Sequence, residues 1–281
     1  MILRYLFTFY CVALGLSGEA FGAPIQGEAS LEKRQAGQLI TRCTVPNTVG
    51  MSFDDGPYNY LHDIVNTLKA NNATATFFFS GDNWNCIYNA DAAERVQYAY
   101  NNGMHVASHT WRHGDLATMN WDLIHDEMWR VEQALLKIVG AYPAFMRPPY
   151  GSYNSLVLEA ARVRGQAVVT WDFDSQDSMG ASAQQSINLY QQKIQQHPST
   201  ILPLNHETYC ERLRFILSLH LIDSLSFLRS LASTAYTVLP AVLPKLKAAG
   251  YRVVDVATSQ ISMDDRTFTK RLFLALLVCG F

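Results

Sequence analysis

Charged side chains are scarce in this sequence. Asp, Glu, Lys and Arg make up 16% of its 281 residues, and 22 Lys and Arg against 24 Asp and Glu leave a net charge of −2. A nucleic-acid-binding protein needs a clear basic excess to neutralise phosphates, so this balance argues against that class. The interior also lacks a long uncharged run, so no internal membrane span is indicated. Hydrophobic residues reach 49%, which excludes a disordered chain.

Cysteine is also scarce, with five residues in the chain. Cys11 lies in the predicted signal peptide described below, and an oxidising compartment would allow disulfides among the others. Four cysteines allow three pairings, and the sequence does not choose between them. The four are Cys43, Cys86, Cys210 and Cys279.

The N-terminus predicts a secreted, extracellular protein. An apolar run from Tyr5 to Leu16 follows a short positive start, and small residues then mark a cleavage site, which predicts a signal peptide over residues 1–22. A membrane anchor is the alternative. The pair Lys33-Arg34 resembles a dibasic processing site, so residues 23–34 are either a propeptide or a flexible lead-in.

Short apolar runs alternate with amphipathic segments from Thr48 onwards. About seven strand–helix units predict an α/β fold with parallel strands, closed or nearly closed into a barrel, in one domain over residues 35–258. Chemistry in such barrels lies at the C-terminal ends of the strands. The runs typical of buried strands are 49–53, 75–79, 104–108, 145–147, 166–173, 200–204 and 251–256.

Two adjacent carboxylates, Asp54 and Asp55, end the first predicted strand. Like charges this close repel each other, and a metal ion or a guanidinium would offset the repulsion. The alternative is a turn without chemistry, because Asp-Asp-Gly-Pro sequences are common in turns.

His109 and His113 follow the third predicted strand. Side chains at i and i+4 lie on one face of a helical turn, so the two can share a metal ion. With Asp55 they make a His-His-carboxylate set, and three protein ligands leave a coordination position open, which is typical of catalytic zinc sites. For either His alone, a surface or capped-loop role is the alternative.

Three further strand ends carry polar residues. Arg147 precedes two prolines that stiffen the chain, and it could pair with Asp54 or belong to a rigid surface loop. Asp174 lies in an Asp-rich stretch that is either a polar loop or a partner for Arg147. His206 is weak evidence by itself, and it gains weight from the polar residues at the other strand ends.

Five motifs resemble those of the polysaccharide deacetylase family (carbohydrate esterase family 4, NodB homology domain), and within it those of fungal chitin deacetylases. The resemblance runs from about residue 42 to 209 and resumes from 234 to 257. It implies a distorted (β/α) barrel. The motifs are Ser52-Phe53-Asp54-Asp55-Gly56-Pro57, His109-Thr110-Trp111-Arg112-His113, Arg147-Pro148-Pro149-Tyr150, Asp174-Ser175-Gln176-Asp177 and Leu204-Asn205-His206.

The resemblance implies a metal site and a catalytic set. Asp55, His109 and His113 would bind a divalent ion, usually Zn²⁺, with Co²⁺ as an option. A zinc ion lowers the pKa of water to about 7, so hydroxide is available at neutral pH.

The remaining roles are implied in the same way. Asp54 would be the general base for the water at the metal, and His206 would be the general acid that protonates the leaving amine. Arg147 would orient Asp54, and Asp174 would support that pair. The backbone N–H of Tyr150 would stabilise the oxyanion.

Two segments depart from the family pattern. Residues 210–233 are rich in Leu and Ser, and they are either an extra apolar helix or a retained intron in a conceptual translation. The tail over residues 259–281 is either mis-spliced or a GPI signal. Relatives carry a Cys soon after the last strand that commonly pairs with a Cys matching Cys43, and here Val256-Ala257-Thr258-Ser259 replaces it.

The expected function is a secreted, metal-dependent deacetylase that hydrolyses the N-acetyl groups of chitin to give chitosan and acetate. We expect a monomer whose partner is chitin or a related acetylated polysaccharide, with association to the cell wall as an option and no nucleic-acid partner. Alternatives are an acetylxylan esterase, another glycan deacetylase of the family, or a non-catalytic glycan-binding protein.

Overall fold

The computed structural model describes residues 37–208 and 234–260. Several predictions fall outside these ranges: the signal peptide at 1–22, the propeptide at 23–34, the segment 210–233 and the tail beyond residue 260. Cys210 and Cys279 lie outside them as well, while Cys43 and Cys86 are free thiols.

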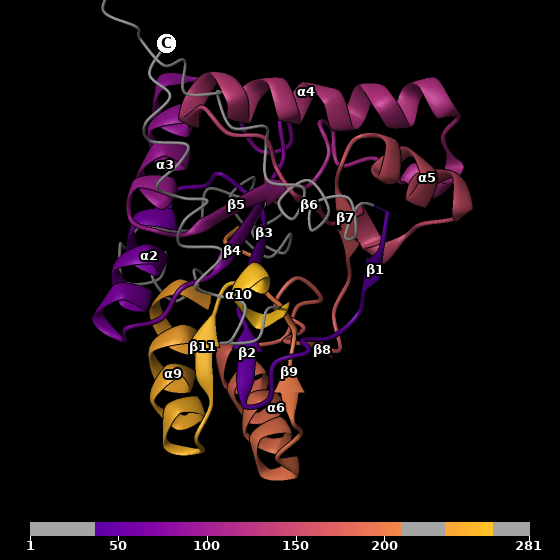
Figure 1. Ribbon diagram of the computed structural model, residues 1–281. Coiled ribbons are helices and arrows are strands. Elements are labelled where there is room, and N and C mark those ends of the chain that lie inside the picture. Colours follow the sequence, from indigo (N-terminus) through magenta and orange to yellow (C-terminus); the bar gives the residue numbers. More distant parts are fainter. Residues whose placement is uncertain (1–36, 209–233, 261–281) are drawn as a thin grey trace, which may run out of the picture.

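The strands form a curved, wholly parallel arrangement in the middle of the molecule (Figure 1). One sheet has six strands, in the order β1 (Leu39–Ile40), β7 (Ala167–Val169), β6 (Phe145–Met146), β5 (His105–Ser108), β4 (Thr76–Phe79) and β3 (Ser52–Gly56). A second has the order β11 (Arg252–Val254), β2 (Thr48–Gly50) and β9 (Thr200–Ile201), and a third pairs β10 (Pro203–Leu204) with β8 (Phe173–Asp174).

Two stretches of chain pass from one sheet to another and so join the sheets into a distorted barrel. β2 and β3 are separated only by Met51, and β9 and β10 only by Leu202. The Met51 amide donates to the carbonyl of Val254 across 2.8 Å, and its own carbonyl accepts from the Thr76 amide across 2.9 Å, so this residue bonds to both neighbouring sheets. The predicted parallel α/β barrel is confirmed.

The strand predicted at 166–173 is divided into β7 and β8. Val168 and Val169 pair with β1, and the chain then leaves that sheet. Asp172 causes part of the change, because its amide donates to the Leu202 carbonyl (3.0 Å) and its carboxylate accepts from the Leu202 amide (2.8 Å). β8 therefore pairs with β10 instead.

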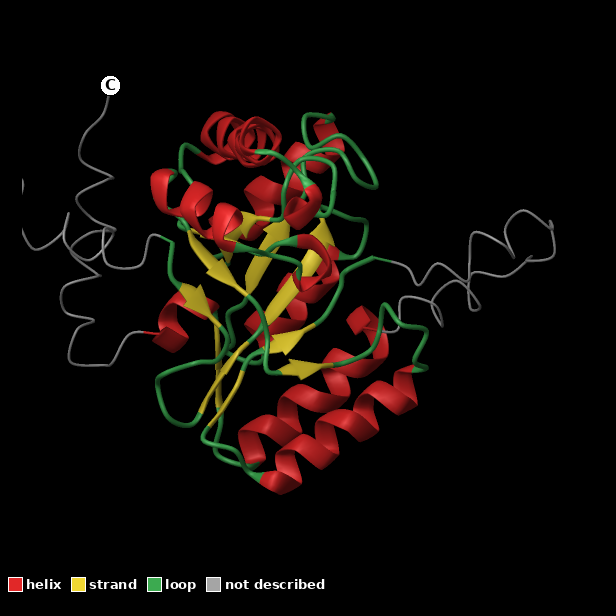
Figure 2. Ribbon diagram, turned by 90° about the vertical axis from the view of Figure 1, so that its right-hand side faces the viewer, coloured by secondary structure: helices red, strands yellow, loops and turns green. Residues whose placement is uncertain are grey.

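Helices lie outside the strands, as Figure 2 shows. The longest, α4 (Trp121–Val139), is capped at both ends: the Asn120 side chain accepts from the Leu123 amide at its start, and Gly140 ends it in the left-handed conformation. The others are α2 (Leu61–Ala70), α3 (Ala90–Asn101), α5 (Ser155–Val163), α6 (Ala183–Gln196), α9 (Leu239–Ala248) and α10 (Val256–Gln260), with short turns η1 (Leu116–Thr118), η2 (Pro149–Gly151) and η3 (Thr234–Val238).

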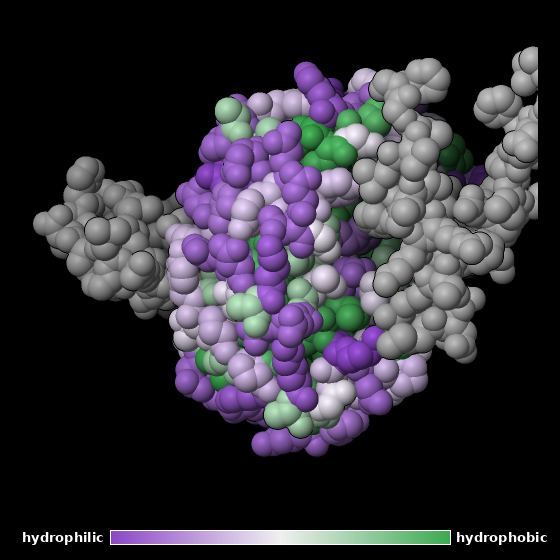
Figure 3. Space-filling model, turned by 60° about the vertical axis from the view of Figure 1, so that its left-hand side comes forward, coloured by the Kyte–Doolittle hydropathy of each residue, from purple (hydrophilic) through white to green (hydrophobic). Residues whose placement is uncertain are grey.

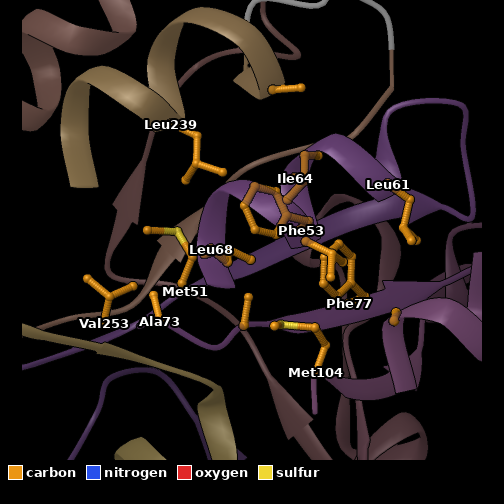
Figure 4. Close-up of a cluster of buried hydrophobic side chains, with 14 of the residues drawn as sticks. Met51, Phe53, Leu61, Ile64, Leu68, Ala73, Phe77, Met104, Leu239 and Val253 are labelled. Carbon is orange, nitrogen blue, oxygen red and sulfur yellow. The ribbon is translucent and has the colours of Figure 1, made fainter. Parts of the chain in front are cut away.

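The main hydrophobic core fixes β2 and β3 against the helices. Figure 4 shows Met51 and Phe53 directed toward side chains of α2 and α9, among them Leu68 and Leu239. Phe53 also stacks on Phe77 of β4 at a centroid distance of 5.3 Å. Burying a side chain of this size contributes about 1.5–3 kcal/mol, so the position of β3, whose end carries Asp54, is well determined.

The surface shown in Figure 3 is largely hydrophilic, with hydrophobic residues in small groups. Among the helices in residues 37–208 and 234–260, none combines the length and the apolar character needed to cross a membrane.

Candidate active site

The two carboxylates at the end of β3 face different surroundings. Asp54 is a buried strand residue, while Asp55 has a φ of 73° and the strand register shifts between Asp54 and Gly56. A left-handed conformation at a non-glycine residue is uncommon and tends to mark functional sites. Here it lets adjacent residues of one strand present their side chains to separate partners.

Asp55 lies beside the two predicted histidines. Its Oδ1 is 3.1 Å from Nε2 of His113 and 3.4 Å from Nε2 of His109, and the three ligand atoms lie within 4.8 Å of one another. Although burial alone would raise the pKa of Asp55, hydrogen bonds from His109 and His113 hold it well below its ordinary value. An ionised carboxylate and two imidazoles directed at one point suit a divalent transition metal such as zinc or cobalt.

His109 is oriented by a second contact. Its Nδ1–H donates to the main-chain carbonyl of Arg147 across 2.7 Å, which leaves Nε2 directed at Asp55. Such a contact on the far nitrogen is the usual way in which proteins fix the tautomer of a metal-binding histidine. The His109 and His113 rings are 4.9 Å apart, and His113 has a φ of 55°. The predicted helical turn between them is absent: residues 109–113 form an irregular loop with positive φ at Thr110 and His113, and this loop brings both rings to one side.

Arg147 forms a buried ion pair with Asp54. Its Nη1 donates to Asp54 Oδ1 across 2.8 Å and to the Ser52 hydroxyl across 2.9 Å, and its Nη2 donates to the Thr170 carbonyl. The guanidinium also lies 4.3 Å from the centre of the Phe78 ring. Burial lowers the pKa of Arg147, and the charge of Asp54 partly offsets that effect.

His206 reaches the same region from the end of β10. It forms a parallel bridge with Asp54, and its Nδ1 donates to Asp177 Oδ1 across 2.8 Å. Burial lowers the pKa of His206, but the charge and hydrogen bond of Asp177 outweigh burial and raise it to about 9. The imidazole is thus held as a cation at neutral pH.

The prediction that Asp174 supports Arg147 and Asp54 is wrong. Its Oδ1 accepts from the Gln176 amide across 2.7 Å and stabilises the turn after β8. Nη1 and Nη2 of Arg147 donate to Asp54, Ser52 and Thr170, and within the described part of the chain no hydrogen bond or ion pair joins Arg147 to Asp174. The Asp of this motif that enters the site is Asp177, through His206.

Tyr150 lies at the rim of the site. It has a φ of 61°, its side chain is 71% exposed, and its ring is 4.9 Å from that of His113. This placement next to the metal-ligand set is compatible with a role for its backbone N–H toward a bound substrate.

Glu207 is a functional candidate that the sequence analysis did not single out. Its side chain is buried, and neither carboxylate oxygen has a hydrogen-bond partner among the described residues. Burial raises the pKa of Glu207 well above its ordinary value. A side chain on Gly56 would collide with Oε1, so glycine at that position makes room for the carboxyl group. Two features of the sequence could have indicated Glu207. It is an acidic residue directly after His206, and a glycine directly follows Asp55.

Comparisons with known proteins point to one family. The family model for polysaccharide deacetylase matches residues 41–169. A chitin deacetylase from Pestalotiopsis sp is 41% identical over 162 residues, which cover 58% of this chain and 53% of the relative. A chitin deacetylase from Colletotrichum lindemuthianum is 32% identical over 167 residues, or 58% of this chain and 67% of that protein. The chain thus spans about half the length of the Pestalotiopsis protein.

The fold has close counterparts among solved structures. The structure of the chitin deacetylase from the fungal pathogen Colletotrichum lindemuthianum superposes with a TM-score of 0.68, covering 80% of this chain and 92% of that chain. At 24% identity this likeness bears on the fold alone.

Proposed function

The chain belongs to the polysaccharide deacetylase family, and from this premise we propose that it hydrolyses the N-acetyl groups of chitin to give chitosan and acetate. The observation that carries the proposal is the convergence of three sets of residues. The Asp55–histidine set, the Asp54–Arg147 pair and the His206–Asp177 pair come from the ends of different strands and meet beside one another.

Asp55, His109 and His113 are the residues that would hold the divalent metal, with zinc preferred and cobalt as an option. When bound, such an ion supplies a Lewis acid that polarises the acetyl carbonyl and makes water a stronger acid. The buried Oδ1 of Asp55 supports this assignment, because it lies 3.1 and 3.4 Å from the Nε2 atoms of His113 and His109, and one carboxylate oxygen and two imidazole nitrogens directed at one point are a common donor set for a divalent metal.

Asp54 is the general base in this proposal. Arg147 occupies its Oδ1, and its Oδ2 lies 3.9 Å from His109 Nε2, on the side of the metal-ligand set. Oδ2 is therefore the oxygen placed to take a proton from water. A general base has to lie within hydrogen-bond reach of that proton, and the fixed guanidinium keeps the carboxylate turned toward it.

His206 is the general acid. Its Nδ1 is engaged by Asp177, which leaves Nε2 to donate a proton to the amine. An amine is a poor leaving group unless it is protonated, and an imidazolium with a pKa of about 9 holds that proton at neutral pH. The backbone N–H of Tyr150 is assigned to the oxyanion that forms on the acetyl carbonyl.

The setting of the reaction is part of the proposal. The predicted signal peptide over residues 1–22 supports a secreted enzyme, which would meet chitin outside the cell or in the cell wall. We propose that it acts as a monomer, because the residues assigned to the reaction all come from one chain.

Acetate release from N-acetylglucosamine oligomers tests the proposal. The purified protein is stripped with chelator and assayed with and without added Zn²⁺ or Co²⁺. Activity is expected only with metal, and His113→Ala should abolish both activity and stoichiometric metal binding. His62→Ala is the matched control, because His62 lies outside the site and contacts Glu94 and Tyr98. Release of acetate from acetylated xylan but not from chitin oligomers would identify xylan as the substrate instead. Bound metal without acetate from any glycan would indicate a binding protein.

A further inference from the structure

Within residues 37–208 and 234–260, four donors contact the carboxylate of Asp177. The Ser178 amide and His206 Nδ1 donate to Oδ1, each across 2.8 Å. The His206 amide and the Thr234 hydroxyl donate to Oδ2, also across 2.8 Å each. A carboxylate offers about four lone-pair sites, so this one is fully coordinated.

Thr234 differs from the other three donors. Two of the other donors are the backbone amides of Ser178 and His206, and the third is the His206 imidazole. Thr234 comes from η3, next to α9, and it is the one side chain among the four donors that reaches Asp177 from outside the segments of His206 and of Asp177 itself. Both Thr234 and Asp177 are 8% exposed, so water does not readily replace the hydroxyl.

Because Asp177 is buried, the hydrogen bond from Thr234 helps to stabilise its charge. An ionised carboxylate out of contact with water is unfavourable unless its lone pairs are satisfied. Among the described residues, the cation that pairs with Asp177 is His206, while Asp54 and Asp55 add further negative charge around the imidazole. Burial alone would raise the pKa of Asp177, but the charge of His206, together with the hydrogen bonds from His206 and Thr234, keeps it below its ordinary value.

We propose that Thr234 is a positioning residue for the reaction: its hydroxyl fixes the rotation of the Asp177 carboxylate, which holds His206 with Nε2 toward the substrate. The inference rests on the proposed function, because it assigns Thr234 a part in orienting the general acid. Loss of this donor would free Oδ2 and let the carboxylate turn, so that His206 would spend less time in the productive orientation.

The local packing allows a clean substitution. Thr234 shares a small internal space with Tyr190, Val238 and Leu239. Valine has nearly the shape of threonine, and the methyl group that replaces the hydroxyl would face Oδ2 of Asp177 without donating a hydrogen bond to it. Thr234→Val thus removes the donor while keeping the volume, Thr234→Ser keeps the donor, and Thr237→Val is a control on the exposed side of the same turn.

The test compares these variants in steady-state kinetics on N-acetylglucosamine oligomers with metal present. Thr234→Val should lower kcat by about tenfold or more with KM within about twofold, since a hydrogen bond to a charged group is being removed. In a plot of kcat against pH, the decline at alkaline pH should begin at a lower pH for Thr234→Val than for the wild type. Thr234→Ser should recover most of the activity, and Thr237→Val should match the wild type. Equal losses in the Ser and Val variants, or none in Val, would overturn the proposal.

A readout without activity separates this inference from the proposed function. The His206 ring is followed by NMR through a pH titration of the wild type and the Thr234 variants. Thr234→Val should lower the pKa of His206, and Thr234→Ser should not. If the wild type deacetylates nothing, the proposed function fails, and this titration still decides whether Thr234 controls His206. An unchanged His206 titration in Thr234→Val would refute the positioning role.

Discussion

Arg147 and Asp54 are joined by an ion pair that is closed to solvent, with 0% of the Arg147 side chain and 2% of the Asp54 side chain exposed. The pair therefore differs from the exposed ion pairs on the helices, such as Arg162 with Glu159. Removing one partner of a buried pair leaves the other charge without compensation, whereas breaking an exposed pair changes little.

Arg147→Ala should lower the free energy of unfolding by about 3–5 kcal/mol. Urea unfolding followed by circular dichroism measures the change, with Arg162→Ala as the matched control at about 0–1 kcal/mol. Equal losses in both variants would contradict the buried-pair argument.

Asp177→Asn should shift the alkaline limb of activity. The pKa of His206 is raised from 6.5 to about 9 mainly by Asp177, so the proton stays on the imidazole up to about pH 9. Without the carboxylate charge that pKa should fall toward its ordinary value, and kcat should decline at a lower pH. The stability that the charged imidazole contributes is fully present below pH 6.5 and is lost as the pH rises through about 9, so the variant should be most destabilised relative to wild type at acidic and neutral pH. Asp174→Asn is the control, and an identical shift there would contradict the assignment of Asp177.

Glu207→Gln should stabilise the protein at neutral pH. Because the pKa of Glu207 is raised well above its ordinary 4.5, the folded state keeps a proton that the unfolded state loses. The wild type should lose stability relative to the variant as the pH rises above 4.5, by about 1.4 kcal/mol per pH unit, until the folded-state pKa is reached. Below pH 4.5 the two should be alike. Thermal unfolding across pH 4–7 measures this, and Glu94→Gln, at an exposed position, should show no such trend.

Ser259→Cys should restore a disulfide with Cys43. The Thr44 amide donates to the Ser259 carbonyl, and a side chain on Gly50 would touch both Cys43 Sγ and Ser259 Oγ, so the two side chains lie next to each other. The bond should raise the free energy of unfolding by about 2–4 kcal/mol under oxidising conditions. Thiol titration and unfolding with and without reductant test it. If oxidation removes no more thiols from the variant than from the wild type, the geometry does not permit the bond.

The sequence predicts much of this site because its signals are local. His109 and His113 follow a strand at a fixed spacing, and Asp55 ends another, so parallel strands alone bring them to one edge. Which Asp of the fourth motif enters the site is not a local property. Asp174 and Asp177 are three residues apart, and the choice depends on the turn that Asp174 itself stabilises and on donors from Thr234, distant in the sequence. The buried Glu207 is similar, because only the fold shows that Gly56 leaves room for it.

Oδ2 of Asp177 accepts hydrogen bonds from two segments that are distant in the sequence. It binds the main chain at His206, just before residues 209–233, and the side chain of Thr234, just after them. The two described ends of the chain on either side of these residues are therefore held to the same oxygen atom. One carboxylate thus fixes both the residue proposed as the general acid and the start of η3, so the distance between these two points is set by Asp177 and not by the residues that connect them.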